Sequence, residues 1–243
     1  MGRIFSVVSG KGGTGKSTFS TTLALSFVSM KKRVLLLDLD AGLRCLDIIL
    51  GIESKVMLDL SDVLSGRAYK DALCFSTINK NLALLPAPLY PIDINPVEFK
   101  KILTEVCNDF DIVILDFPAG LDFKLCSVLP KESEFITVCN SDPVSVKGAA
   151  AVCYELKKRN FISRLVINRF NPDTIKSGMY TNIDNIIDNS GIQLLGIMPE
   201  SKDLLFLPVY HCIKKHSNAG RAIIRIANRL NGKRVPLPNP KKI

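Results

Sequence analysis

Residues 9–18 read Ser9-Gly10-Lys11-Gly12-Gly13-Thr14-Gly15-Lys16-Ser17-Thr18, and this stretch decides the fold. It matches the template of a phosphate-binding loop, in which four residues separate one glycine from a second glycine that is followed by lysine and serine. An apolar run over residues 4–8 indicates a strand before the loop, and residues 17–30 have the length and apolar spacing of a helix after it. The loop therefore lies between a strand and a helix, which is the context that a nucleotide phosphate site requires.

The residue types in this loop predict how it would hold phosphate. Glycines let the backbone turn tightly and point its N–H groups inward, and the following helix adds free N–H groups and the positive end of its dipole. Lys16 would reach the β- and γ-phosphates, the Ser17 hydroxyl would ligate Mg²⁺, and Thr18 would donate to the α-phosphate. The loop residues expected to bind the nucleotide are Gly10, Lys11, Gly12, Gly13, Thr14, Gly15, Lys16, Ser17 and Thr18.

The composition indicates one large α/β domain. The chain has 243 residues, of which 47% are apolar, so it can bury a sizeable core. Seven cysteines are scattered without a C-x-x-C pair, which favours reduced thiols. No stretch approaches the length of a transmembrane helix, and the first strand leads into the loop without a signal peptide. We therefore expect a cytoplasmic protein, with peripheral attachment to the inner face of the cell membrane as a further option.

The net charge of +9 is concentrated near the end of the chain. Residues 214–243 carry nine basic residues and no acidic ones, which equals the whole net charge. Such a field attracts nucleic acid or an anionic membrane surface, although a solvated helix face is an equal alternative. The basic residues are Lys214, Lys215, Arg221, Arg225, Arg229, Lys233, Arg234, Lys241 and Lys242.

The rest of the chain alternates strand and helix patterns. Continuous apolar strands separated by helices predict a mostly parallel, twisted sheet with helices on both faces, which is the three-layer fold of P-loop NTPases. We expect a P-loop domain over residues 1–232 and a basic, proline-rich, unpacked tail over 233–243. Further strands are expected at 33–37, 82–85, 111–115, 134–139, 164–167 and 193–198, and further helices at 96–107, 144–159 and 218–230.

Polar residues follow the predicted strands at their carboxyl ends, where ligands bind in open α/β sheets. Asp38 and Asp40 follow the second strand, and Asp116 follows the strand 111–115. Asn168 and the Pro199-Glu200 pair follow the last two strands. These residues should therefore converge with the loop on one site, in which the carboxylates position Mg²⁺ and an attacking water.

Several motifs together resemble the MinD/ParA class of ATPases. Lys11 makes the loop similar to the deviant Walker A motif of that class, and the remaining motifs look more like those of bacterial septum-site-determining MinD proteins than those of ParA. The likeness runs in order from residue 3 to about residue 230. The motifs that carry it are Asp38-Leu39-Asp40-Ala41-Gly42-Leu43-Arg44-Cys45-Leu46-Asp47, Asn81-Leu82-Ala83-Leu84-Leu85-Pro86-Ala87, Asp116-Phe117-Pro118-Ala119-Gly120, Arg169-Phe170-Asn171-Pro172 and Gly196-Ile197-Met198-Pro199-Glu200.

The resemblance implies a role for each matching position. Lys11 would reach the phosphates of a partner subunit across an ATP-dependent homodimer, while Lys16 would hold the bound phosphates within its own subunit. Asp40 would orient the hydrolytic water. Ser17, Asp38 and Asp116 would hold Mg²⁺, and Asn168, Pro199 and Glu200 would contact adenine. The implied activity is slow, partner-stimulated ATP hydrolysis that serves to place the division site, and the implied partner is an activating or regulatory protein.

The sequence departs from this family at its end. MinD proteins finish in an amphipathic membrane helix, whereas three prolines in the tail, Pro236, Pro238 and Pro240, disfavour one here. Arg221, Arg225 and Arg229 recur every four residues, so they would line one helix face that contacts anionic lipid or non-specific DNA. The alternatives are therefore a ParA-like partitioning ATPase and a nucleotide-sensing adaptor without turnover.

Overall fold

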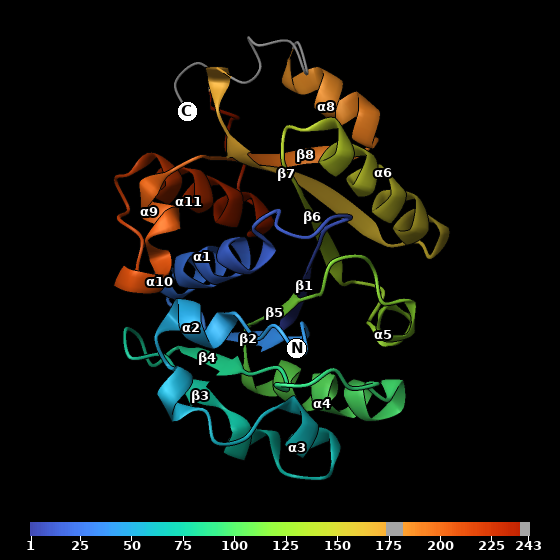
Figure 1. The fold of residues 1–243 in the computed structure, drawn as a ribbon, viewed down its shortest axis with the longest axis vertical. Helices are drawn as coiled ribbons and strands as arrows, with labels where there is room; N and C mark the ends of the chain where they lie inside the picture. The colour runs from blue at the N-terminus through green and yellow to red at the C-terminus, as the bar shows by residue number, and fades with distance from the viewer. Residues whose placement is uncertain (174–181, 239–243) are drawn as a thin grey trace.

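A computed structural model describes residues 1–173 and 182–238 of the chain (Figure 1). These residues form one eight-stranded sheet in the order β3-β4-β2-β5-β1-β6-β7-β8, in which only β3 runs antiparallel to its neighbour. The predicted mostly parallel sheet is confirmed. The strands are β1 (Arg3–Val8), β2 (Val34–Asp38), β3 (Cys74–Phe75), β4 (Leu82–Leu85), β5 (Ile112–Asp116), β6 (Glu134–Cys139), β7 (Ile162–Phe170) and β8 (Gln193–Pro199).

Helices cover both faces of the sheet, as Figure 1 shows. On one face α1, α2 and α11 pack around Phe5 and Leu36, and on the other α3, α4 and α5 pack around Leu35 and Val113. The helices are α1 (Lys16–Ser29), α2 (Leu46–Leu50), α3 (Leu60–Leu64), α4 (Pro96–Asp109), α5 (Phe123–Val128), α6 (Pro143–Lys158), α8 (Ile183–Ser190), α9 (Lys202–Leu205), α10 (Leu207–Tyr210) and α11 (Asn218–Leu230), with 3₁₀ turns at Glu53–Lys55 and Tyr69–Ala72.

Local chemistry sets where the longer helices begin. The side chain of Asn95 accepts hydrogen bonds from the first turn of α4, and the side chain of Asp142 does the same for α6. A proline follows each cap, at the position where its missing N–H costs nothing.

Every helix and strand expected from the sequence is present, with ends shifted by three residues at most. Within the described ranges no helix is long and apolar enough to cross a membrane.

The end of the chain differs from the expected unpacked tail. Residues 233–238 form neither helix nor strand, yet the backbone carbonyl of Val235 accepts two hydrogen bonds from the guanidinium of Arg229. The tail is therefore held against the domain at this point. Residues 239–243, with Pro240, Lys241 and Lys242, lie outside the described residues. The division of the chain at residue 232 stays a prediction.

Candidate nucleotide site

The loop after β1 is open where a ligand would approach it and tightly packed behind. Gly13 and Gly15 have φ values of 74° and 87°, in the left-handed region that favours glycine. A β-carbon on Gly12 or Gly13 would meet nothing within 4 Å, whereas one on Gly10 would collide with the backbone of Gly148 in α6. The loop therefore offers bare backbone on its open side and rests on α6 on the other.

The first turn of α1 leaves its backbone donors without a side-chain cap. Gly15 occupies the N-cap position, so no side chain caps the helix, and the first turn has no acidic residue. The N–H groups and the positive end of the dipole therefore face the loop, which is the arrangement that binds phosphate. Lys16 is buried, and Ser17 and Thr18 line the same cleft.

Two buried carboxylates face each other at the ends of neighbouring strands. Asp38 and Asp116 are directly paired in the register of β2 and β5, and each is 1% exposed. One oxygen of Asp38 accepts from the N–H of Asp40 at 3.0 Å, and one oxygen of Asp116 accepts from the Ser20 hydroxyl at 2.8 Å. The second oxygen of each carboxylate has no hydrogen-bond partner in the described structure. Such a pair fits a cation, which would satisfy the two orphaned oxygens.

The raised pKa values of Asp38 and Asp116 also agree with a cation site. Burial raises the pKa of Asp116 to about 6, although the neighbouring hydroxyls of Ser17 and Ser20 act to lower it. Burial and the neighbouring charge of Asp116 raise the pKa of Asp38 well above its ordinary value. Without a cation the two groups therefore resist being ionised together. No cluster of three or more metal-binding side chains occurs in residues 1–173 and 182–238, so a cation here would take its other ligands from Ser17 and the phosphates.

Asp40 begins the loop that leads from β2 into α2. It is half-buried, and burial raises its pKa while the charge of Lys16 lowers it. Its carbonyl accepts from the N–H groups of Leu43 and Arg44 at 3.2 Å, which closes a turn, and the N–H of Gly42 donates to Pro88 at 3.0 Å. The carboxylate of Asp40 lines the cleft on the side where Lys16 lies.

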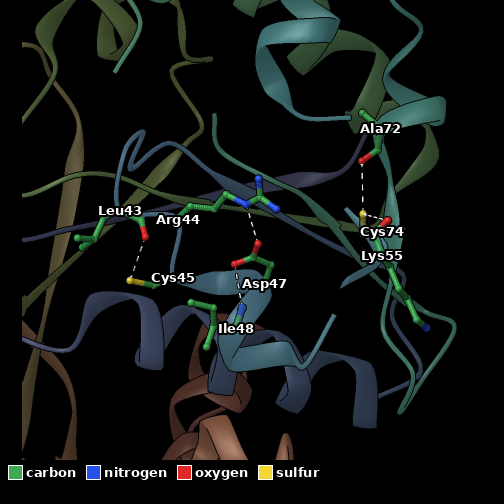
Figure 2. Close-up of polar contacts among 8 residues, drawn as sticks. All are labelled: Leu43, Arg44, Cys45, Asp47, Ile48, Lys55, Ala72 and Cys74. Atoms are coloured by element: carbon green, nitrogen blue, oxygen red, sulfur yellow. Dashed lines mark hydrogen bonds and ion pairs between the residues drawn. The ribbon is translucent and has the colours of Figure 1, made fainter. Parts of the chain in front are cut away.

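A buried ion pair fixes the far end of this loop, as Figure 2 shows. Arg44 donates from Nε to Asp47 over 2.6 Å, and the two side chains are only 13% and 4% exposed. The other oxygen of Asp47 accepts from the N–H of Ile48. Cys45 lies beside this pair and donates to the carbonyl of Leu43 (Figure 2). The loop from Asp38 to Cys45 is therefore anchored to the first turn of α2.

A second half of the cleft extends from the loop toward β7 and β8. It has a volume of about 530 Å³, within the usual size for small-molecule sites. Gly15, Thr18 and Arg169 line both halves, so the two halves are continuous. Pro199 and Glu200 line this second half, and their contact with adenine, which the family resemblance implies, stays a prediction.

Asn168 lies in the same half, but its side chain is engaged with the loop. Its amide donates to the carbonyl of Thr14 at 2.8 Å, and the residue is 5% exposed. A β-carbon on Gly15 would also collide with this amide, so loop and amide are closely packed. One amide hydrogen therefore supports the phosphate loop, while the second hydrogen and the amide oxygen are left for the predicted contact with adenine, which stays a prediction.

Arg169 is a cleft residue to which the sequence argument gave no role. It has φ 50°, an uncommon value for a residue other than glycine, and it lies where the register of β7 and β8 shifts. Its exposed side chain lines both halves of the cleft. Its position directly after Asn168, at the end of a predicted strand, is the sequence feature that could have identified it as a cleft residue.

Lys11 lies apart from the other loop side chains. It is not among the residues that line either half of the cleft. Its ammonium lies 3.6 Å from a carboxylate oxygen of Asp142, the residue that caps α6, and the Lys11 side chain is 48% exposed. Within one chain, the structure therefore does not bring Lys11 together with Lys16 and Asp40.

Arg221, Arg225 and Arg229 recur every four residues along α11, and none of them is buried. Arg221 donates to the carbonyl of His216 and to Asn218. Arg229 donates to the carbonyls of Leu195 and Val235, and it is only partly exposed. Arg229 therefore serves to hold β8 and the tail together, and contact of this helix face with DNA or lipid stays a prediction.

The family follows from a profile match over most of the chain. The CobQ/CobB/MinD/ParA nucleotide binding domain matches residues 5–211. The chain belongs to this family. Within the CobQ/CobB/MinD/ParA family, a septum site-determining protein MinD from Thermotoga maritima is 30% identical over 250 residues, covering 98% of this chain and 92% of that protein.

Solved structures of family members have the same fold. MinD of Aquifex aeolicus, in a MinC:MinD cell division protein complex, matches with a TM-score of 0.87 at 29% identity, covering 98% of this chain and 99% of that one. MinD of Pyrococcus horikoshii, complexed with Mg-ADP, matches with a TM-score of 0.80 at 25% identity, covering 95% and 96%. The chain is a MinD-like ATPase of the CobQ/CobB/MinD/ParA family.

Proposed function

We propose that this chain is a Mg²⁺-dependent ATPase that dimerises when ATP binds and acts as a spatial regulator of division-site placement. One observation carries the proposal. The uncapped, glycine-lined loop leads into α1, whose Ser20 hydroxyl donates to Asp116, the partner of Asp38 at the ends of β5 and β2, in a chain that matches MinD proteins over nearly its full length. This is the donor set that an ATP–Mg²⁺ complex needs.

Each residue contributes by position and charge. The loop amides and Lys16 bind the phosphates, and Ser17, Asp38 and Asp116 would hold Mg²⁺, which when bound supplies positive charge to the phosphate oxygens. Asp40, at the mouth of the same cleft, orients the attacking water. Asn168 keeps the loop in shape through Thr14, and Pro199 and Glu200 bound the space for the base.

The site is completed by a second copy of the chain. Lys11 lies outside the cleft of its own subunit and is half-exposed, so its ammonium is available to the phosphates of a partner. The Aquifex aeolicus relative was solved with MinC, which supports a regulatory protein as a further partner of this chain. A cytoplasmic protein that attaches peripherally to the membrane would meet both partners, a second copy of itself and a regulatory protein.

Substitution of the two loop lysines tests the proposal. Lys16→Ala should abolish ATP binding, whereas Lys11→Ala should retain binding as a monomer and lose ATP-dependent dimerisation and turnover. ATP affinity, phosphate release and molar mass by light scattering measure the three properties. Lys100→Ala, on the exposed surface of α4, is the matched control. Unchanged turnover in both loop variants would refute the proposal.

A ParA-like partitioning role is less supported. The relatives reported above are septum site-determining MinD proteins, and Arg229, part of the basic face that DNA binding would use, is tied to backbone carbonyls. A nucleotide-sensing adaptor would bind ATP without hydrolysing it. Phosphate release from the wild-type chain in the presence of its partner would therefore favour the ATPase over the adaptor.

A further inference from the structure

The two halves of the cleft have separate walls. Ile49 of α2 lines the phosphate side, and α2 follows directly on the loop from Asp38 to Cys45. Leu204, Leu205 and Pro208 of α9 and α10 line the base side. Besides Gly15, Thr18 and Arg169, which line both halves, contacts between α2 and α10 connect the phosphate-side loop to the base-side wall.

His211 makes such a contact. It ends α10, and its ring nitrogen Nδ1 lies 3.0 Å from the carbonyl oxygen of Ile49. Because a carbonyl only accepts, Nδ1 carries the hydrogen. The flat side of the ring packs on Gly51, where any β-carbon would collide with the imidazole. Figure 1 shows α2 and α10 side by side.

The backbone around this contact is specialised on both sides. His211 has φ 52° and Gly51 has φ 63°, so each helix ends in a left-handed residue at the point where they touch. A residue with a side chain seldom adopts this conformation, so surrounding contacts must hold His211 there. The hydrogen bond to Ile49 and the packing on Gly51 are those contacts.

We propose that His211 is a positioning residue that couples the Asp38–Cys45 loop, through α2, to the base-side wall formed by α9 and α10. When the loop responds to the γ-phosphate, α2 carries Ile49 and Gly51 with it, and His211 moves α10. Leu205, Phe206, Val209 and Tyr210 are exposed in the segment of α9 and α10, so the coupling brings an apolar surface under the control of the bound nucleotide. The inference rests on the proposed function, because it requires ATP in the cleft.

Hydrogen exchange with ADP and with a non-hydrolysed ATP analogue tests the coupling. In the wild-type chain the analogue should protect residues 38–50 and also 202–211 more than ADP does. In His211→Ala the analogue should still protect residues 38–50 but should no longer protect residues 202–211. The ratio of ADP to ATP-analogue dissociation constants should fall by roughly 2- to 10-fold, which is the scale of one hydrogen bond.

Two further variants keep the test independent of folding. His211→Asn places an amide donor near the position of Nδ1 and tolerates the left-handed backbone, so it should restore the protection of 202–211. Gly51→Ala should behave like His211→Ala. His216→Ala, the other histidine, whose side chain is exposed, is the matched control.

The outcomes separate the two proposals. The coupling is refuted if the ATP analogue protects residues 202–211 in His211→Ala as it does in the wild type. It is also refuted if His211→Asn does not restore this protection while His216→Ala retains it. Protection of residues 10–18 and 38–50 without any effect at 202–211 in the wild type refutes the coupling alone. Absence of protection at residues 10–18 refutes the proposed function itself.

Discussion

At the scale of single residues, the paired carboxylates give the site a pH signature. Asp116 has a pKa of about 6 in the folded chain against 3.8 for an unperturbed aspartate. Between these values the folded chain binds more protons than the unfolded chain, so the free energy of unfolding falls as pH rises. The carboxylate pair therefore destabilises the metal-free protein at neutral pH, and a bound cation would remove that cost.

Asp116→Asn should make the metal-free protein more stable at pH 7. The shift of about two pKa units corresponds to roughly 3 kcal/mol, present above pH 6 and absent below pH 4. Urea unfolding from pH 4 to 8, in chelator, should show a weaker pH slope for this variant than for the wild type. Asp71→Asn, at an exposed position, should keep the wild-type slope. An unchanged slope in Asp116→Asn would contradict this account.

Arg229→Ala should destabilise the chain, whereas Arg225→Ala should not. The first change removes the donor to the carbonyls of Leu195 and Val235, at a cost of about 1–3 kcal/mol because the acceptor on the buried Leu195 is left unpaired. Thermal or urea unfolding measures both variants. Equal stability of the two would mean that the Arg229 hydrogen bonds do not hold the tail and β8 together.

At the scale of elements, the sequence predicts the long strands and helices but few of the short ones. β2 and β5 are continuous apolar runs, and α4 and α6 carry a cap and a proline, so local patterns determine them. α9 and α10 have four residues each, too few for a helical period to appear. Tertiary contacts, rather than local sequence, place these short helices.

The residues of the site likewise form two groups, those that the sequence predicts and those that it does not. The loop, Asp38 and Asp116 were predictable because parallel strands bring their carboxyl ends to one edge. Arg169 depends on a register shift between β7 and β8, and His211 touches a carbonyl 162 residues away. The engagement of Asn168 with Thr14 likewise joins distant segments. No periodicity or spacing within one segment carries this information.

Contact between the loop and α6 leads to a further prediction. Gly10→Ala should destabilise the chain by about 1–3 kcal/mol, since the new β-carbon collides with the backbone of Gly148 and overpacks the contact. Gly12→Ala serves as the control for stability, since its β-carbon would lie in open space. Differential scanning fluorimetry without nucleotide compares them. A Gly10→Ala melting temperature equal to that of Gly12→Ala would refute this account of the packing.

At the scale of the whole molecule, the basic end of the chain should govern binding to polyanions. Each phosphate contact contributes roughly 0.9 to the slope of log affinity against log salt for duplex DNA. Neutralising Arg221 and Arg225 together should lower that slope by about two if DNA is the surface bound, and leave it unchanged if it is not. Anionic vesicles, tested in parallel with ATP present, identify the membrane alternative.

The contact between Lys11 and Asp142 has a thermodynamic consequence for assembly. Half-exposed ion pairs contribute about 0–1 kcal/mol, so little is lost when Lys11 leaves its own carboxylate. Association of two subunits would then be an exchange, in which one anion replaces another beside the same ammonium. The driving force of such an exchange is the difference in charge between a triphosphate and a single carboxylate. An equilibrium balanced in this way shifts toward separate subunits once the γ-phosphate is gone.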